Sequence, residues 1–195
     1  MTDLTPDTTT EPLRFGFGDT ALGIIVVAAG ARGVAALFIG NDRAKLSRDL
    51  KQVFPSAELI LDQTGLGETI AKAAALIDAP HLGTDMALDL RGSATEVAVW
   101  QALQAIPPGE TRSYGFIAKT LPKILPKILP KILPKTLAKT LPMTATAQDV
   151  GAACAANRIA VAVPCHRVVK SDGSISGYRW GVQRKRRLIN MEGVA

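Results

Sequence analysis

Apolar residues in the N-terminal half of the chain fall into short runs that predict strands and helices. Two aliphatic runs at 22–29 and 34–39 flank a Gly-Ala-Arg-Gly turn, which is the pattern of a β-hairpin. The next segment, Arg43 to Val53, has helical composition and must end near Pro55. Beyond it we expect a strand at 57–61, a helix at 68–77 and a strand at 86–90. Together these elements predict a small mixed α/β unit.

Helical patterns dominate from Ser93 onward. Ser93 begins a helix with capping-box spacing, and the Pro-Pro-Gly stretch at 107–109 stops it. A short helix is predicted at 113–121 and another at 146–157, the latter again opening on capping-box spacing. Short helices in succession in a basic region predict a helix-turn-helix.

A four-residue repeat, Leu-Pro-Lys-Ile, separates the last two predicted helices. Its prolines at 122, 126, 130 and 134 each remove a backbone donor, so we expect an extended, polyproline-like excursion instead of a regular helix. Lys-Thr-Leu at 119–121 recurs at 139–141, as tandem duplication of a short coding unit would leave it. We interpret residues 122–141 as a tolerated surface insertion. The alternative is that its lysines follow the phosphates of a nucleic acid.

Charge is distributed unevenly along the chain. Residues 1–110 hold 8 basic and 14 acidic residues, whereas residues 111–195 hold 15 basic and 3 acidic ones. This asymmetry predicts that only the C-terminal part faces a polyanion such as nucleic acid. Because five of the lysines belong to the repeat, the basic cluster at 184–187 is better evidence for this than the net charge of +6.

Length and cysteine content limit the class of protein. With 195 residues, 47% of them hydrophobic, the chain can form two small cores, which we place at 12–88 and 89–195 behind a disordered Thr-, Asp- and Pro-rich tail at 1–11. The two cysteines follow no secretory signal, which predicts a reduced, cytoplasmic protein. Charged and glycine residues interrupt the apolar region at 21–40, so we expect no membrane span.

Cys165 and His166 are adjacent in the sequence Pro-Cys-His-Arg-Val-Val. A thiol is a good nucleophile only as the thiolate, and a histidine that takes its proton generates one near neutral pH. Taken alone, the pair fits a buried core cysteine beside a surface histidine better than a catalytic pair. We interpret Cys154 as structural. Two histidines and two cysteines do not have zinc-finger spacing, so no metal site is predicted.

Several short motifs accompany the Cys165-His166 pair, and together they span most of the chain from Leu88 onward. They are Trp100-Gln-Ala-Leu, the stretch from Ile106 to Tyr114, Ala152 to Asn157, Pro164 to Val169, Asp172-Gly173, Ser176 to Gly181 and Glu192-Gly193. In these motifs the chain closely resembles the O6-alkylguanine-DNA alkyltransferases of the Ada C-terminal and Ogt type. The resemblance implies an α/β (α+β) fold, with an RNase H-like N-terminal domain and a C-terminal winged helix-turn-helix domain.

The resemblance also implies a partner and an activity. The helix-turn-helix would enter the minor groove of double-stranded DNA and flip a damaged guanine into a pocket. The alkyl group of O6-methylguanine, and of O4-methylthymine, would pass irreversibly to Cys165, so that each molecule acts once. We therefore expect a monomer that needs no cofactor.

Individual roles follow from the same resemblance. Cys165 matches the alkyl acceptor, activated through a water by His166, which Glu192 orients. Tyr114 matches the tyrosine that supplies a proton to the departing base, and Asn157 matches the asparagine that braces the turn before the active site.

DNA and base contacts are implied for a further set of positions. The predicted DNA-binding residues are Thr146, Gln148, Ala152, Ala153, Arg158 and Arg167, and the predicted base-pocket residues are Val168, Ser176 and Gly177. One of them departs from the family, which usually carries an arginine where this chain has Gln148. Glutamine can insert and hydrogen-bond, but it brings no charge to the orphaned cytosine.

Three other functions remain open at this point. The chain could be a DNA-binding lesion sensor whose repair is weakened by Gln148 and the repeat. A cysteine-dependent hydrolase would use Cys165, His166 and a carboxylate for acyl transfer. A regulatory DNA-binding module is disfavoured, because such activators carry an upstream cysteine-rich zinc module and this chain has only two cysteines.

Overall fold

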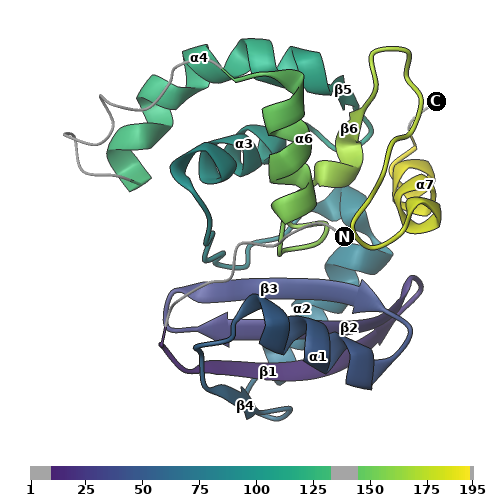
Figure 1. Cartoon of the computed structure of the whole chain (residues 1–195). Coiled ribbons are helices and arrows are strands. Elements are labelled where there is room, and N and C mark those ends of the chain that lie inside the picture. Colours follow the sequence, from purple (N-terminus) through teal and green to yellow (C-terminus); the bar gives the residue numbers. More distant parts are fainter. Residues whose placement is uncertain (1–9, 133–144, 194–195) are drawn as a thin grey trace.

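The computed structural model describes residues 10–132 and 145–193, and for residues 124–132 it describes the backbone alone. Figure 1 shows a β-sheet at one end of the molecule and a group of helices at the other. The predicted tail at 1–11 lies mostly outside the described residues, although Glu11 is ordered by an ion pair with Arg91 at 2.9 Å. Among the described residues, no helix is both long and apolar enough to cross a membrane.

Four strands form the sheet in the order β3-β2-β1-β4. Strands β1 (Leu13–Thr20), β2 (Gly23–Gly30) and β3 (Gly33–Gly40) are an antiparallel meander, and β4 (Leu59–Leu61) pairs in parallel with β1. The predicted hairpin is confirmed as β2 and β3. Its turn requires glycine at Gly33, where φ is +124° and an added Cβ would lie 2.3 Å from the Ala87 carbonyl oxygen.

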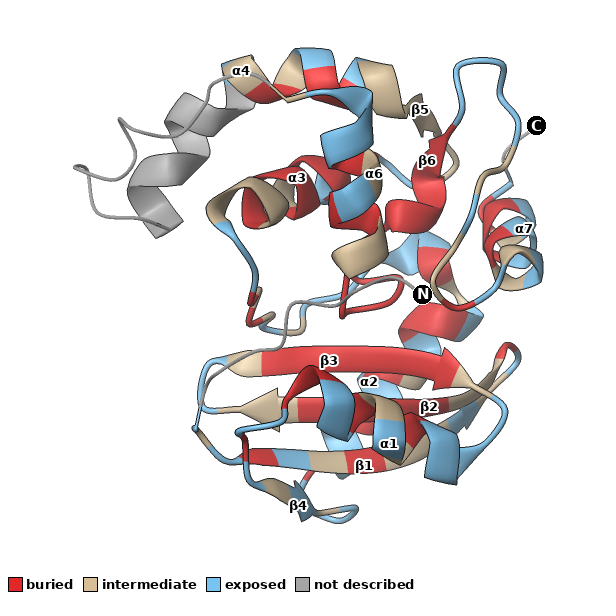
Figure 2. Cartoon of the chain, in the orientation of Figure 1, coloured by how far each residue is buried: buried red, intermediate tan, exposed pale blue. Residues whose placement is uncertain are grey.

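Two helices, α1 (Arg43–Val53) and α2 (Gly67–Asp78), cover the opposite faces of the sheet. A Cβ at Gly40 would meet Leu46 of α1, whereas one at Gly18 would meet Ile70 of α2. Because β2 and β3 are covered on both faces, they are nearly continuous apolar runs and are buried along most of their length (Figure 2).

The predicted strand at 86–90 is wrong. Only Leu88 makes a β-bridge there, to Val34 at the outer edge of β3. The hydrogen bonds are those from Val34 N to Ala87 O and from Asp89 N to Val34 O, both 2.8 Å. A single bridge fixes the chain at this edge, and the apolar alternation that suggested a strand reflects this one contact.

The second half of the chain is mostly helical. Its helices are α3 (Ala94–Gln104), α4 (Tyr114–Ile132), α6 (Ala147–Ala156) and α7 (Val182–Met191). It also contains the 3₁₀ turn η2 (Cys165–Arg167) and a parallel pair of two-residue strands, β5 (Arg112–Ser113) and β6 (Val168–Val169), while another 3₁₀ turn, η1 (Pro80–Leu82), follows α2. Both predicted capping boxes are present, at Ser93 and at Thr146. The indole Nε1 of Trp100 donates to Ala153 O at 2.7 Å and joins α3 to α6.

Helix α4 continues through the first part of the proline repeat, so the expected extended conformation is wrong as far as Ile132. Pro126 lacks the N–H that would donate to Pro122 O, and the four-residue spacing places the missing donors near one side of α4. Residues 133–141 of the predicted insertion lie outside the described residues.

The sheet and the helices share one apolar core. Leu37 of β3 forms a bridge with Ile159, in which Leu37 N donates to Arg158 O and Ala160 N donates to Leu37 O, each at 2.9 Å. Since residues 159–165 lead directly to Cys165, the sheet supports the segment that carries the predicted nucleophile.

Candidate active site

Two tight turns present Cys165. The first is a γ-turn at Val161, where Ala162 N donates to Ala160 O at 2.6 Å. Val161 has a φ of 64°, the one positive φ of a non-glycine residue in the described part of the chain, and its branched side chain makes that conformation strained. The second is an inverse γ-turn at Pro164, with Cys165 N donating to Val163 O at 2.8 Å.

Asn157 connects these turns to the thiol. Its side-chain amide nitrogen donates to Cys165 Sγ at 3.2 Å and to Val163 O at 3.0 Å. Its amide oxygen accepts from Ile159 N at 2.8 Å. One buried side chain at the end of α6 therefore fixes both the loop and the cysteine, which is the placement that the predicted bracing role requires.

The Cys165 thiol is protonated in the resting protein. Burial raises its pKa, while the hydrogen bond from Asn157 and the positive charges of Lys185 and Arg179 oppose that rise. Because only 3% of the residue is exposed, the thiol needs a base close by to become a nucleophile.

His166, the next residue in the chain, is the predicted base. Its Nε2 lies 2.9 Å from Glu192 Oε1, and both side chains are fully buried. Burial raises the pKa of Glu192, but hydrogen bonds from His166 and Arg167 outweigh it and lower the pKa to about 2. An ionised carboxylate can only accept, so Nε2 carries the proton and Nδ1 keeps a lone pair.

The imidazole of His166 is neutral, and one of its nitrogens, Nδ1, has no hydrogen-bond partner among the described residues. Burial, together with the positive charges of Arg167 and Lys185, lowers the pKa of His166 although Glu192 raises it. Its Nδ1 is buried, and no described residue hydrogen-bonds to it. A neutral ring with a free, basic nitrogen is the form that a general base requires.

A cavity of about 450 Å³ opens in front of Cys165. Tyr114 and Ser176 line it, with the Tyr114 hydroxyl and Ser176 Oγ 2.6 Å apart. Burial raises the pKa of Tyr114, so the phenol keeps its proton and can donate it. Gly177 lines the same cavity, as predicted, but Val168 is not among the described lining residues and is completely buried in β6.

Cys154 also lines this cavity. Burial raises its pKa, and the neighbouring Cys165 raises it further. Cys154 is therefore a thiol, as Cys165 is, and its interpretation as structural stays a prediction. Among the described residues, no group of three or more His, Cys, Asp and Glu side chains could hold a metal ion.

The predicted DNA-binding residues divide into two groups. Thr146, Gln148 and Ala152 are exposed along α6. Ala153 is 1% exposed because its side of α6 packs against α3, so its predicted surface position is wrong. The predicted surface positions of Arg158 and Arg167 are also wrong, because both side chains are buried.

Arg158 and Arg167 are interior residues. The guanidinium carbon of Arg158 lies 5.6 Å from the centroid of the Phe54 ring, in the core beside α1. Arg167 donates to Glu192 through Nε and Nη2 and to Ile106 O through Nη1 at 2.6 Å. Hydrogen bonds and an ion pair of this kind compensate for the burial of an arginine. Arg167 thereby fixes the carboxylate of Glu192, which in turn orients His166.

Lys185 is a site residue that the sequence did not indicate. It belongs to the basic cluster at 184–187, yet it is fully buried and its Nζ donates to Val168 O at 2.5 Å. Its charge opposes the rise of the pKa of Cys165. The helical spacing could have predicted its burial, because Leu188 and Ile189 lie three and four positions farther along the same face of α7.

Comparisons with known proteins place these features in context. Residues 132–194 match the family model described as 6-O-methylguanine DNA methyltransferase, DNA binding domain. The chain is 37% identical over 180 residues to the bifunctional transcriptional activator/DNA repair enzyme Ada of Escherichia coli, covering 92% of this chain but only 45% of that protein. It is 31% identical over 144 residues to the methylated-DNA–protein-cysteine methyltransferase of Candida albicans, covering 73% of this chain and 70% of that one. The crystal structure of Mycobacterium tuberculosis OGT in complex with DNA is 28% identical, with a TM-score of 0.66 and 92% of both chains covered.

Proposed function

Because the chain belongs to the methylated-DNA–protein-cysteine methyltransferase family, we propose that it repairs DNA by moving the methyl group of O6-methylguanine to its own Cys165. We propose O4-methylthymine as a second substrate, whose methyl group would pass to Cys165 in the same way. The observation that carries the proposal is a buried thiol that lines a cavity and is followed in the chain by a neutral imidazole, whose Nδ1 has no partner among the described residues and whose Nε2 contacts an ionised carboxylate.

The reaction begins with the thiol. His166 Nδ1 takes the proton of Cys165 through a water, and Glu192 stabilises the imidazolium that forms. The thiolate attacks the methyl carbon, a sulfur–carbon bond forms, and the bond from carbon to O6 breaks with its electron pair going to the guanine. Tyr114 gives the departing base a proton and is later reprotonated by the proton that His166 received.

A thioether forms on Cys165 in this reaction. Ordinary thiols do not reverse it, so each molecule repairs one base. The chain acts as a stoichiometric reagent, and one methyl group per molecule is the expected yield.

DNA is the proposed partner, bound through the minor groove by a monomer. The exposed face of α6, with Thr146, Gln148 and Ala152, would approach the duplex. Support comes from the similarity to the tuberculosis protein, whose structure contains DNA. Gln148 would enter the space that the flipped nucleotide leaves, without adding charge.

The decisive experiment mixes equimolar protein and a duplex that contains one O6-methylguanine, and maps the added methyl group by mass spectrometry. We expect one methyl group on Cys165. Cys165→Ser should take up none, while Cys154→Ser, the matched control in the same cavity, should react like the unaltered chain.

Other outcomes identify the competing functions. Methylation of Cys154, or several repairs per molecule, would contradict the mechanism. Tight lesion binding without transfer would identify a sensor, and a transient acyl adduct would identify a hydrolase.

A further inference from the structure

The exposed face of α6 carries an acidic residue in an otherwise basic part of the chain. After residue 110 the sequence holds 15 basic and 3 acidic residues. Of the acidic ones, Glu192 is buried in the site and Asp172 lies in the turn after β6. The third, Asp149, is exposed and follows Gln148 directly. It is the single charged residue of α6, which contains no lysine or arginine.

Hydrogen bonds fix the carboxylate of Asp149. Its Oδ2 accepts from Thr146 N at 2.7 Å and from Thr146 Oγ1 at 2.8 Å. The bond from the Thr146 backbone and then that from its hydroxyl lower the pKa of Asp149, so the carboxylate is ionised at neutral pH. The amide nitrogens at the start of a helix attract anions such as phosphate, and a carboxylate held there offsets that attraction.

A duplex that approached this face would bring its phosphates towards the carboxylate. Most of the non-specific affinity of a protein for duplex DNA comes from lysines and arginines that neutralise phosphates. The exposed neighbours of Asp149, which are Thr146, Gln148 and Ala152, carry no charge that could compensate for it. Exposed lysines such as Lys119 on α4 lie outside α6. Attraction to DNA therefore has to come from other segments, and α6 opposes it.

We propose that the Asp149 carboxylate lowers the affinity of the chain for duplex DNA by repelling its phosphates. The inference rests on the proposed function and deepens it, since it assigns a residue of the DNA-facing surface that limits binding. The repulsion acts on damaged and undamaged duplexes alike. Because undamaged sites greatly outnumber lesions, weaker binding shortens the time that each molecule spends on them. Asp149 is not among the described residues that line the cavity of Cys165, so it should not affect the transfer step.

The test measures binding to an undamaged duplex and methyl transfer from the same duplex with one O6-methylguanine. Asp149→Asn removes the charge, while its amide oxygen can still accept the bonds from Thr146. At about 0.05 M salt we expect the dissociation constant for the undamaged duplex to fall about three- to tenfold. At about 0.3 M salt the difference should shrink to less than about twofold, because salt screens exposed charges.

Single-turnover transfer separates binding from chemistry. The DNA concentration that gives half of the maximal rate constant should fall in Asp149→Asn, while the maximal rate constant stays within about twofold of that of the unaltered chain. Asp149→Glu keeps the charge and the capping-box arrangement, so its affinity should stay within about twofold of the original at either salt concentration.

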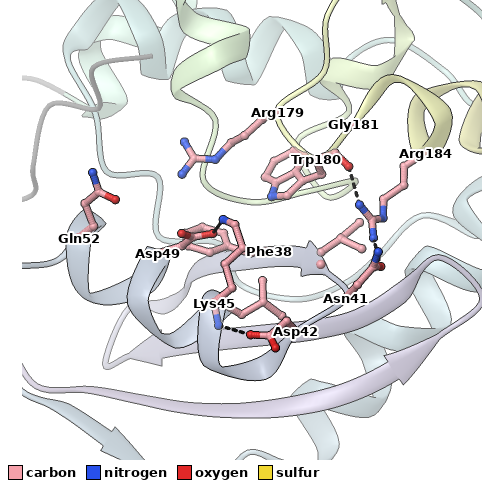
Figure 3. Close-up of a pocket in the computed structure, with 13 residues that line it drawn as sticks. Phe38, Asn41, Asp42, Lys45, Asp49, Gln52, Arg179, Trp180, Gly181 and Arg184 are labelled. Atoms are coloured by element: carbon pink, nitrogen blue, oxygen red, sulfur yellow. Dashed lines mark hydrogen bonds and ion pairs between the residues drawn. The ribbon is translucent and has the colours of Figure 1, made fainter. Parts of the chain in front are cut away.

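Asp42→Asn is the matched control, because it makes the same change in net charge at the start of another helix. Asp42 is exposed, accepts from Lys45 N at 2.5 Å and lines a cavity of about 540 Å³ beside the sheet (Figure 3). It caps α1, which covers the sheet, whereas α6 belongs to the helical half of the molecule (Figure 1). We expect its DNA affinity to change by less than about twofold.

The remaining outcomes decide against the inference. Unchanged or weaker binding by Asp149→Asn overturns it. A gain that persists at about 0.3 M salt would show that charge is not responsible, and an equal gain in Asp42→Asn would show that the position of the charge is not. Thermal unfolding verifies that each variant is folded, and Asp149→Ser serves if Asp149→Asn is not. Absence of methyl transfer in the unaltered chain would instead overturn the proposed function.

Discussion

At the scale of single residues, the site depends on three buried charged or titratable groups that satisfy one another. Glu192 accepts from His166 and from Arg167, and Arg167 also donates to Ile106 O. The sequence motifs indicated His166 and Glu192 but assigned Arg167 to DNA. Its actual role depends on a contact across 25 positions of the chain, which no local pattern reveals.

The carboxylate of Glu192 makes folding sensitive to acid. Its pKa is about 2 in the folded protein against 4.5 as the ordinary value, so its contribution to the free energy of unfolding is complete above pH 4.5 and is lost as the pH falls towards 2. Glu192→Gln leaves Arg167 buried without its counter-ion and should lower that free energy at pH 7 by about 3 kcal/mol. The difference between the two proteins should shrink below pH 4.5.

Urea unfolding at pH 7 and at pH 3 measures this effect. Glu110→Gln removes a carboxylate that pairs with Arg112 at the surface, and it should change the free energy of unfolding by less than about 1 kcal/mol at either pH. A loss in Glu192→Gln that is equally large at both pH values would show that the carboxylate contributes through packing and not through its charge.

At the scale of elements, local signals predicted some boundaries well. Helix α1 begins and ends as predicted, because Asp42 caps it, accepting from Lys45 N at 2.5 Å, and Pro55 follows its end. Strand β1 was missed, because Gly16 and Gly18 lower its strand propensity. Those glycines are explained only by packing, since a Cβ at either would lie within 2.8 Å of Ile70 on α2.

Helix α4 carries the clearest prediction at this scale. Its described buried residues, Ile117, Ala118 and Leu121, all precede the repeat. Deletion of residues 122–141 should therefore keep the packed part of the helix and shift the melting temperature by only a few degrees. Repair in a single-turnover assay should be preserved or improved.

A point variant provides the comparison for this deletion. Leu121→Ala removes a buried side chain of the same helix, and it should lower the free energy of unfolding by about 2–5 kcal/mol. If the deletion unfolds the protein while Leu121→Ala does not, the repeat stabilises the fold. If the deletion variant folds but no longer binds DNA, the repeat is part of the DNA interface. Either outcome would contradict its interpretation as a tolerated insertion.

At the scale of the whole molecule, the sequence indicated two units but not how they meet. We propose 12–88 and 89–195 as those units. Their contacts include the bridge between Leu37 and Ile159 and the stacking of Arg158 and Arg179 on phenylalanines of the first unit. Each contact joins residues far apart in the chain, so charge and periodicity could not predict it. The basic cluster at 184–187 is an example, because Lys185 is buried and Arg184 hydrogen-bonds to the first unit instead of facing DNA.

Arg184 is the best test of this junction. It donates from α7 to Leu22 O at 2.8 Å and to Asn41 Oδ1 at 2.5 Å in the first unit, and to Trp180 O at 2.8 Å. Arg184→Ala removes all three bonds, and it should lower the free energy of unfolding by about 1–3 kcal/mol. Arg187→Ala, three positions along the same helix and exposed, should change it by less than about 0.5 kcal/mol.

Because α7 also carries Lys185 and is capped at its C-terminus by Glu192, loosening this helix should reach the active site. Hydrogen exchange should increase in α7 and in the 165–169 segment of Arg184→Ala, and methyl transfer to Cys165 should slow in parallel. Arg187→Ala should show neither change. If exchange increases only within the sheet while transfer keeps its rate, then α7 is held by its own unit, and the junction stabilises the fold without positioning the site.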